Sequence, residues 1–573
     1  MAQVEGNEES DVGSDEESDE ESGIAQRPGY DDLNGDTLCR LECNDPGIVG
    51  LTITPESWIK GAGQVLGENK SLQKLDIEAD DSEDGIWLEE VFTGLSRNRN
   101  LESLTLSRMI LRDPHRDVDY ESELMCNFRH LAPFFEYNCN LLSLELSELD
   151  IGQVSHYLAL ALAKCEYSRL ESITLCELKV NDKQLAMIIR SLSGKKFLQD
   201  ISITINGTDG DHTCRELSKL LQSPSTKIKS LHLDWDEDML RKPEDRILTI
   251  AKGLMVNWTV KTISLPLYHI RSSSFTVWNV VSQVFSRPMS SIETLNLESS
   301  VLGNDDLTHL SDALADNKTL KELILSDNEG EITLAGWRHL FRCLENDNFA
   351  LKVVLNISGC NITNDWVASM ATSLSSNTSL KKLDMSDNEG LSYAGWITFL
   401  HILLLGDWNC RSRCSLELID LRNTGGKEGI SDMDWAEDQM VSIIWNALCN
   451  DRNGLEGILD SNHTLHTFLW CGSWREEICE FLELNAIKDK VEVARLKTIK
   501  YHFEDYDMIG KHRMFATLPD IVLPYALEWI GRGSNRDGFS LMYTVCNFLP
   551  TLVEVREAND IPPHKRMKKE GSV

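Results

Sequence analysis

The sequence has no excess of basic residues, no long apolar run and no regular cysteine spacing. Its 573 residues contain 56 Lys and Arg against 92 Asp and Glu, a formal net charge of −36. Such a chain is unsuited to binding nucleic acid or an anionic membrane surface, because both attract cationic proteins. The longest apolar stretch, 399–405, is interrupted by His401 and is much shorter than the roughly 20 residues that span a bilayer.

Signals for export, metal binding and catalysis are also missing. The 15 cysteines are odd in number and scattered, and the first residues lack a basic segment followed by an apolar core, so we expect reduced thiols and no secretory signal. The pairs Cys410/Cys414 and His463/His466 lie about fifty residues apart, unlike the usual zinc site. No phosphate-binding loop, dinucleotide-binding glycine motif, nucleophile elbow or HExxH motif occurs. We therefore expect no catalytic residue, no metal, no cofactor and no enzyme.

What the sequence does contain is a repeat. An apolar residue, two variable residues, a second apolar residue, one variable residue and a third apolar residue recur along the chain, and the central apolar residues are mostly 28–30 positions apart. A period of this length indicates a repeat architecture. The central residues are Leu75, Leu104, Leu144, Ile173, Ile201, Leu231, Ile263, Leu295, Leu323, Leu383 and Ile419. A degenerate copy contains Leu355 and Ile357, and weaker copies surround Leu51/Ile53 and Leu465/Phe468.

The segments between the copies have the period of a helix. For example, Leu307, Leu310 and Leu314 fall on one face of a helix. Longer spacings indicate insertions around 111–120 and 424–461. The sequence therefore predicts alternating short strands and helices along most of the chain.

Asparagines recur at fixed places in the units. Asn328 and Asn388 follow two nearly identical copies, where a buried side chain would satisfy backbone groups at the turn after the strand. A second set stands three residues before the first apolar strand residue, where we expect it to serve the turn that ends a helix. This set is Asn69, Asn257, Asn317, Asn377 and Asn462.

These residues resemble leucine-rich repeats of the long, ribonuclease-inhibitor-like type over 43–484. The resemblance implies an α/β solenoid, a horseshoe with parallel strands on the concave side and helices on the convex side. Since a terminal repeat needs a cover, we interpret 485–556, which has helical apolar patterns, as a C-terminal helical cap. Within it, residues 518–546 faintly resemble an F-box, the helical module of ubiquitin-ligase adaptors.

The two ends of the chain differ in charge. Residues 1–36 carry thirteen acids and one base, which predicts an acidic disordered tail. In it, Ser14 and Ser18 resemble sites of an acidophilic, casein-kinase-type kinase, and the alternative is a solvating tail without a dedicated role. Residues 557–573 are expected to form a basic disordered tail. Its cluster Lys565, Arg566, Lys568 and Lys569 is either a nuclear import signal or an ordinary solvated end.

The variable residue between the second and third apolar positions should point away from the helices, because side chains alternate along a strand. Acidic and small polar residues dominate this row, and the alternative interpretation is an ordinary solvated strand face. The candidate partner-binding residues are Asp76, Glu145, His232, Asn296, Asp384 and Asp420.

The sequence thus predicts a non-catalytic scaffold that binds a protein with a basic or polar surface on its concave face. Two alternatives stay open: a Ran-type GTPase-activating protein, which shares this repeat class, and a ubiquitin-ligase substrate adaptor with a divergent F-box-like C-terminal region. We expect a cytoplasmic monomer, with the nucleus as a further location if the basic cluster acts as an import signal. We expect no nucleic-acid or membrane partner.

Overall fold

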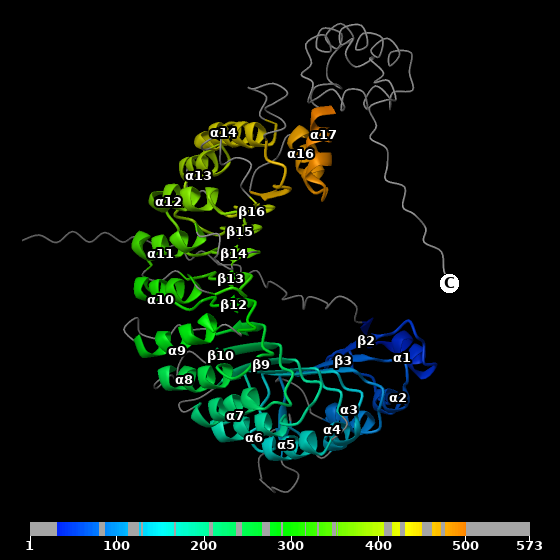
Figure 1. The fold of residues 1–573 in the computed structure, drawn as a ribbon. Coiled ribbons are helices and arrows are strands. Elements are labelled where there is room, and N and C mark those ends of the chain that lie inside the picture. Colours follow the sequence, from blue (N-terminus) through cyan, green and yellow to red (C-terminus); the bar gives the residue numbers. More distant parts are fainter. Residues whose placement is uncertain are drawn as a thin grey trace, which may run out of the picture. The chain divides into compact units, whose positions relative to one another are not determined.

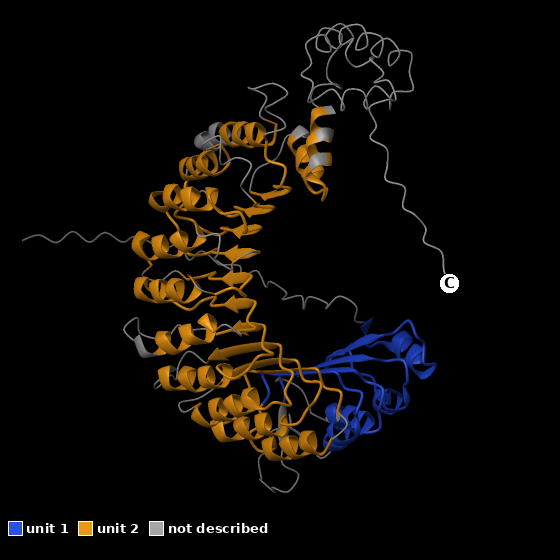
Figure 2. Cartoon of the chain, viewed as in Figure 1, with its two compact units in different colours: residues 1–149 blue, residues 150–573 orange. Residues whose placement is uncertain are grey.

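The structure is a computed structural model whose chain divides into two compact units, unit 1 (Met1–Leu149) and unit 2 (Asp150–Val573), shown in Figure 2. Each unit is described by itself. The structure describes residues 31–79, 86–112, 125–127, 130–165, 168–205, 210–235, 243–265, 275–287, 290–315, 317–328, 332–345, 351, 353–405, 415–424, 430–449, 461–470 and 476–499.

Parallel strands form the ladder of each unit, in an order that follows the sequence. In unit 1 they are β1 (Asp31–Asp32), β2 (Gly50–Ile53), β3 (Lys74–Glu78), β4 (Ser103–Ser107) and β7 (Ser143–Ser147). In unit 2 they are β8 (Ser172–Cys176), β9 (Asp200–Ile205), β10 (Ser230–Trp235), β11 (Thr262–Ser264), β12 (Thr294–Asn296), β13 (Glu322–Ile324), β14 (Val354–Asn356), β15 (Lys382–Asp384), β16 (Leu418–Asp420) and β17 (Thr467–Leu469).

A helix follows most strands and packs on the helix of the next repeat. Figure 1 shows the helices of unit 2 on the outer side of its curved strand ladder. Unit 1 contains α1 (Gly35–Glu42), α2 (Ala62–Glu68), α3 (Ile86–Leu95) and α4 (Ala132–Tyr137). Unit 2 contains α5 (Ser155–Lys164), α6 (Asp182–Ser191), α7 (Asp211–Gln222), α8 (Pro243–Leu254), α9 (Phe275–Ser286), α10 (Asn304–Ala315), α11 (Leu334–Leu344), α12 (Asn364–Ser375), α13 (Tyr393–Leu405), α14 (Ile430–Cys449), α16 (Glu476–Asn485) and α17 (Lys490–Ile499).

Each copy of the repeat contains three apolar residues, which we call the apolar phrase. They form the core because their side chains lie between the strand ladder and the helices. Leu231, Ile263 and Leu295 are fully buried and are aligned on neighbouring strands. The predicted face of α10, including Leu307 and Leu310, is buried as well. The repeat architecture predicted from the sequence is therefore confirmed: each unit is a stretch of an α/β solenoid.

The irregular repeats keep the common register. In the degenerate copy, Leu355 is aligned with Leu323 and Leu383. The weak copies at the two ends form β2 and β17. The insertion regions contain structure of their own: β5 (Ile110–Arg112) pairs with β6 (Met125–Asn127), and α14 lies within 424–461.

Regular secondary structure is present on the N-terminal side of residue 43, where we expected the array to begin. β1 pairs with β2, and α1 begins before residue 43. Asn34 caps this helix, because its Oδ1 accepts a hydrogen bond from the Thr37 backbone N–H at 2.9 Å. The strand β1 consists of two aspartates and lacks the apolar pattern of the repeat, so its pairing with β2 could not be predicted from the sequence.

Buried asparagines close the turns after two strands, as predicted. Asn328 and Asn388 are fully buried. Asn328 Nδ2 donates to the carbonyls of Leu297 and Leu325 at 2.9 and 2.8 Å, and its Oδ1 accepts from Leu302 N–H at 3.1 Å. Each amide thus links two repeats through backbone groups that would otherwise be buried without partners.

The second asparagine set ends the helices, also as predicted. Asn69 Nδ2 donates to the Leu41 carbonyl of the preceding repeat at 2.6 Å, while its Oδ1 accepts from Leu72 N–H at 2.7 Å. Asn257, Asn317 and Asn377 make the same pair of contacts. These amides supply partners for the carbonyl groups at helix ends, which a helix cannot satisfy itself.

Long cationic side chains reach equivalent carbonyls in other repeats. Lys195 Nζ donates to Leu162 O and Cys165 O at 2.6 and 2.7 Å. In α17, the fully buried Lys497 donates to Leu448 O and Asn462 O at 2.9 and 2.7 Å. This contact attaches α17 to the last described strand repeat.

The rest of the expected cap, including the F-box-like 518–546, lies outside the described residues, as do Ser14, Ser18 and the basic cluster near the C-terminus.

Candidate binding surface

The structure arranges the candidate residues in rows on the strand face, the side of each sheet turned away from the helices. In unit 1, Asp76 and Glu145 both align with Thr105 of β4. In unit 2, the aligned row runs without a gap from β8 to β16, and it contains His232 of β10, Asn296 of β12, Asp384 of β15 and Asp420 of β16. The sequence therefore predicted the register of the row correctly.

Two members of the row are buried, although we expected their side chains to be exposed. Asp76 is 6% exposed and Asp420 is 4% exposed. His232 is exposed, whereas Glu145, Asn296 and Asp384 are half-buried. Strand alternation gives the direction of a side chain, but it does not show how far neighbouring side chains cover it.

Asp420 is occupied by an intramolecular ion pair. Its carboxylate accepts hydrogen bonds from Arg422 Nε at 3.0 Å and Nη2 at 2.7 Å, and from the Arg422 backbone N–H at 3.1 Å. The hydrogen bond with Asp420 raises the pKa of the Arg422 guanidinium. Asp420 is therefore a fixed partner of Arg422 rather than an available carboxylate.

The remaining residues of the row make lighter contacts. Asp384 Oδ1 accepts from the backbone N–H and the hydroxyl of Ser386 at 3.0 and 2.8 Å. Asn296 Oδ1 accepts from Glu298 N–H at 2.8 Å, and His232 Nε2 lies 2.8 Å from Ser230 Oγ. Each of these residues is exposed or half-buried, so a ligand could contact it.

Exposed carboxylates also stand where the strands end. Glu177, Asp327 and Asp387 have positive φ angles of 51°, 56° and 58° and are exposed. Asp is one of the residues that tolerate this backbone region. Glu298 and Asp234, two positions beyond the row, are exposed as well.

Sequence reasoning missed a row of charges at the opposite end of the strands. Lys261 and Lys321 both bind Glu293, each with an Nζ–Oε distance of 2.6 Å, and these two hydrogen bonds lower the pKa of the Glu293 carboxyl. Lys381 lies 3.1 Å from Glu417. The sequence did contain a pattern that could have revealed this row, because each of these charged residues directly follows the first apolar residue of its repeat copy. The strand face is thus paired and mixed in charge at one end and acidic at the other.

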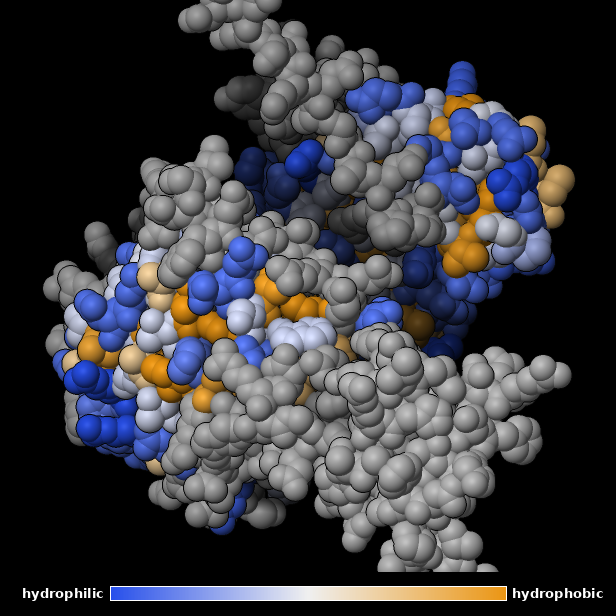
Figure 3. All heavy atoms as spheres, turned by 90° about the horizontal axis from the view of Figure 1, so that it is seen from above, coloured by the Kyte–Doolittle hydropathy of each residue, from blue (hydrophilic) through white to orange (hydrophobic). Residues whose placement is uncertain are grey.

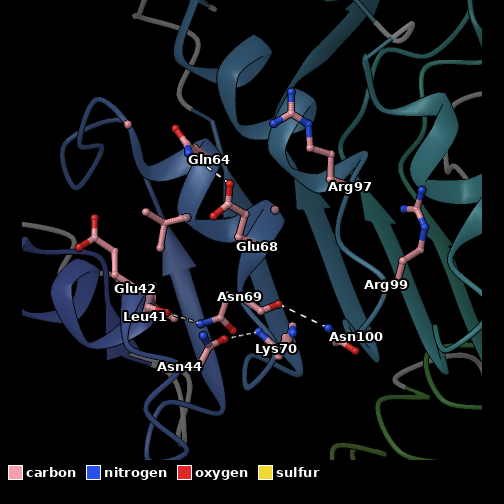
Figure 4. A pocket seen from close by; sticks show the side chains of 13 residues that line it. Leu41, Glu42, Asn44, Gln64, Glu68, Asn69, Lys70, Arg97, Arg99 and Asn100 are labelled. Carbon is pink, nitrogen blue, oxygen red and sulfur yellow. Dashed lines mark hydrogen bonds between the residues drawn. The ribbon is translucent and has the colours of Figure 1, made fainter.

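Unit 1 contains a pocket of about 870 Å³ at the ends of α1, α2 and α3, shown in Figure 4. Its lining includes Lys70, Arg97 and Arg99 together with Glu42 and Glu68. In this view the two arginines stand on the side opposite Glu42. Mixed charges on an open polar surface favour ion pairing and hydrogen bonding with a ligand.

The described residues contain no cluster of three or more His, Cys, Asp or Glu side chains that could hold a metal ion. Across the same part of the chain, every helix is too short or too polar to cross a bilayer. Among the described cysteines, Cys165, Cys214, Cys360 and Cys449 are buried. Burial raises the pKa of the Cys214 thiol to about 12, which disfavours the reactive thiolate.

Curated proteins are similar in sequence to parts of this chain. The ribonuclease inhibitor of Sus scrofa is 29% identical over 253 residues, which cover 43% of this chain and 52% of that protein. The NACHT, LRR and PYD domains-containing protein 14 of Mus musculus is 23% identical over 374 residues, covering 64% of this chain and 34% of the relative. The chain is a leucine-rich repeat protein of the ribonuclease-inhibitor-like type.

This leucine-rich repeat protein matches no family model. It spans about half the length of the porcine relative and a third of the mouse relative. Among solved structures, a chain of the yeast complex of Rad7 and Elc1 is similar with a TM-score of 0.35 and 16% identity, over 62% of this chain and 81% of that one. An internalin from Listeria monocytogenes has a TM-score of 0.30 and 13% identity, over 64% and 84%.

Proposed function

We propose that this leucine-rich repeat protein is a non-catalytic scaffold, and that the acidic end of the strand face in unit 2 binds a protein partner through basic or polar groups. The observation that carries the proposal is the combination of Asp384 in the central row with exposed carboxylates beyond it. Complementary charge of this kind guides the encounter and fixes the orientation of a partner.

The comparisons support the general part of this proposal. The porcine relative is named as an inhibitor of ribonuclease, so that protein acts on another protein. We transfer to this chain only the use of a repeat surface for protein recognition. The basic character of the partner, the monomeric state and the cytoplasmic or nuclear location stay predictions.

The test reverses two carboxylates that are not engaged in an ion pair in the described structure, Glu298 and Asp384. The variant Glu298→Lys/Asp384→Lys should retain the thermal unfolding midpoint and bind the partner roughly tenfold more weakly, a loss of about 1.4 kcal/mol. Asp420 is left unchanged, since its substitution would free Arg422 and disturb the strand. Affinity capture with mass spectrometry identifies the partner, and calorimetry with the purified partner measures the change.

A matched control carries the same charge change on the helix side. Asp312 of α10 and Asp365 of α12 are exposed, and Asp312→Lys/Asp365→Lys should leave binding unchanged. Equal binding by the wild type and the strand-face variant would contradict the proposal. Recovery of Ran with accelerated GTP hydrolysis, or of cullin adaptors, would favour one of the two alternative functions instead.

A further inference from the structure

Three exposed hydrophobic side chains of unit 2 lie in the turns between a helix and the next strand. These turns stand at the N-terminal ends of the strands, and we refer to this side of the ladder as an edge. Trp258 is 71% exposed, Val256 61% and Phe197 50%. Figure 3 shows hydrophilic and hydrophobic residues mixed over the face that it presents. An aromatic side chain exposed to this degree is a candidate contact for another molecule.

The three turns that carry these residues lie side by side. The backbone N–H of Lys229 donates to Gln199 O at 2.6 Å, and that of Lys261 donates to Lys229 O at 2.7 Å. The Thr259 hydroxyl donates to Ile228 O at 2.7 Å. Segments 195–199, 225–229 and 256–261 therefore form one continuous edge over three successive repeats.

This edge is basic although the chain as a whole is acidic. None of the three segments contains Asp or Glu. Lys196, Lys227 and Lys229 are exposed, and no ion pair with a described residue engages the first two. Lys229 donates to the Gln199 side chain at 2.5 Å, while Lys261 is paired with Glu293. The nearest carboxylate along the chain is Asp200, at the start of β9. We call the surface formed by Lys196, Phe197, Lys227, Lys229, Val256 and Trp258 the turn patch.

Helix ends explain only part of this arrangement. Cations are favourable at the C-terminal end of a helix, and Lys195 uses its ammonium group in this way on Leu162 O and Cys165 O. Its neighbour Lys196 points to solvent instead, and a helix end gives no reason to expose Trp258. The combination of uncompensated lysines with exposed aromatic groups indicates a ligand that supplies both negative charge and an apolar contact.

We propose that the turn patch binds an acidic peptide segment of a partner protein, one that also places an apolar side chain against Trp258 and Phe197. A peptide fits better than a nucleic acid. Non-specific binding to nucleic acid draws on several phosphate contacts, whereas the patch offers few lysines and the remaining charge of the chain repels a long polyanion. This surface is separate in position and opposite in sign from the acidic end of the strand face.

The probe is a short fluorescein-labelled peptide of Asp and Glu with one central Leu, added to the full-length chain and followed by fluorescence anisotropy. The variant Lys196→Glu/Lys227→Glu should weaken binding roughly tenfold. Trp258→Ala should weaken binding of this peptide but have little effect on a peptide with Ser in place of Leu. None of these side chains is buried, so the thermal unfolding midpoint should not change.

Lys179→Glu/Lys183→Glu is the matched control, since both lysines are exposed in unit 2 and the charge change is the same. If this control weakens binding as much as the patch variant, the effect is one of net charge and the proposal is overturned. Absence of peptide binding would overturn it as well. Tighter binding of a single-stranded RNA oligonucleotide that also depends on Lys196 and Lys227 would replace the acidic peptide by RNA.

Discussion

At the residue scale, the buried polar side chains of this protein connect repeats by satisfying backbone groups. Asn328 and Asn388 do so after strands, and Asn69 and its equivalents do so at helix ends. A solenoid has many such ends close to its core, and each unpaired carbonyl would cost about 1–3 kcal/mol. Asn69, Asn257, Asn317 and Asn377 are thus structural parts of the repeat.

Lys497 fills the same structural role through the hydrogen bonds that its Nζ donates to Leu448 O and Asn462 O. Burial lowers the pKa of its ammonium group to about 7, with smaller effects of the Cys449 thiol and of Lys490. The unfolded chain holds the proton up to about pH 10.4, the ordinary lysine value. Between these two values the unfolded state binds more protons, so stability should increase with pH across this window.

We therefore expect the free energy of unfolding to rise from pH 7 to pH 9 in the wild type, by at most about 1.4 kcal/mol per pH unit from this group. Lys497→Met should lack this component, because it has no proton to lose. Urea titrations of both proteins at several pH values measure the difference in slope. Parallel pH profiles would show that the native ammonium group has an ordinary pKa.

At the scale of elements, glycines allow neighbouring helices to pack more closely than side chains would permit. In unit 1, α2 and α3 approach so closely that a Cβ on Gly94 would overlap the Gly63 carbonyl, and one on Gly63 would overlap the Glu90 carbonyl. Backbone atoms cannot rotate away as a flexible side chain can. These glycines therefore determine the distance between the two helices.

Gly94→Ala should destabilise unit 1 by about 1–3 kcal/mol, the usual range for overpacking, although alanine is the better helix former. Gly35→Ala in α1 is the matched control, because no atom lies within 4 Å of the added Cβ. Differential scanning calorimetry should show a lower unfolding temperature for the first variant only. An unchanged temperature for Gly94→Ala would mean that α2 and α3 can separate at little cost.

At the scale of the whole molecule, negative charge dominates, but it is not evenly distributed. In unit 2, carboxylates such as Asp327 and Asp387 follow the strands, whereas lysines such as Lys196 and Lys227 precede them. The two edges correspond to helix N-termini and helix C-termini, which favour anions and cations respectively. Two binding surfaces of opposite sign are thus compatible with one repeat.

A net charge of −36 should destabilise the folded chain through self-repulsion at low salt. Raising NaCl from about 10 mM to about 150 mM shortens the screening length from about 30 Å to about 8 Å. We expect the unfolding temperature to rise by roughly 1–3 °C, measured by circular dichroism. Choline chloride should have the same effect, since screening does not depend on the cation. A fall in temperature would show that ion pairs such as Lys261–Glu293 outweigh the repulsion.

The sequence by itself determined the repeat, because its apolar spacing must match a strand followed by a helix, and it determined the register of the candidate row. The sequence also predicted the structural role of the asparagines, because their positions recur with the repeat. Only the tertiary structure decided which polar residues stay accessible: Asp76 and Asp420 are covered by their neighbours, and Arg422 occupies Asp420. It alone brought Phe197, Lys227 and Trp258 to one edge, because adjacency between turns some thirty residues apart arises from strand pairing rather than from local sequence.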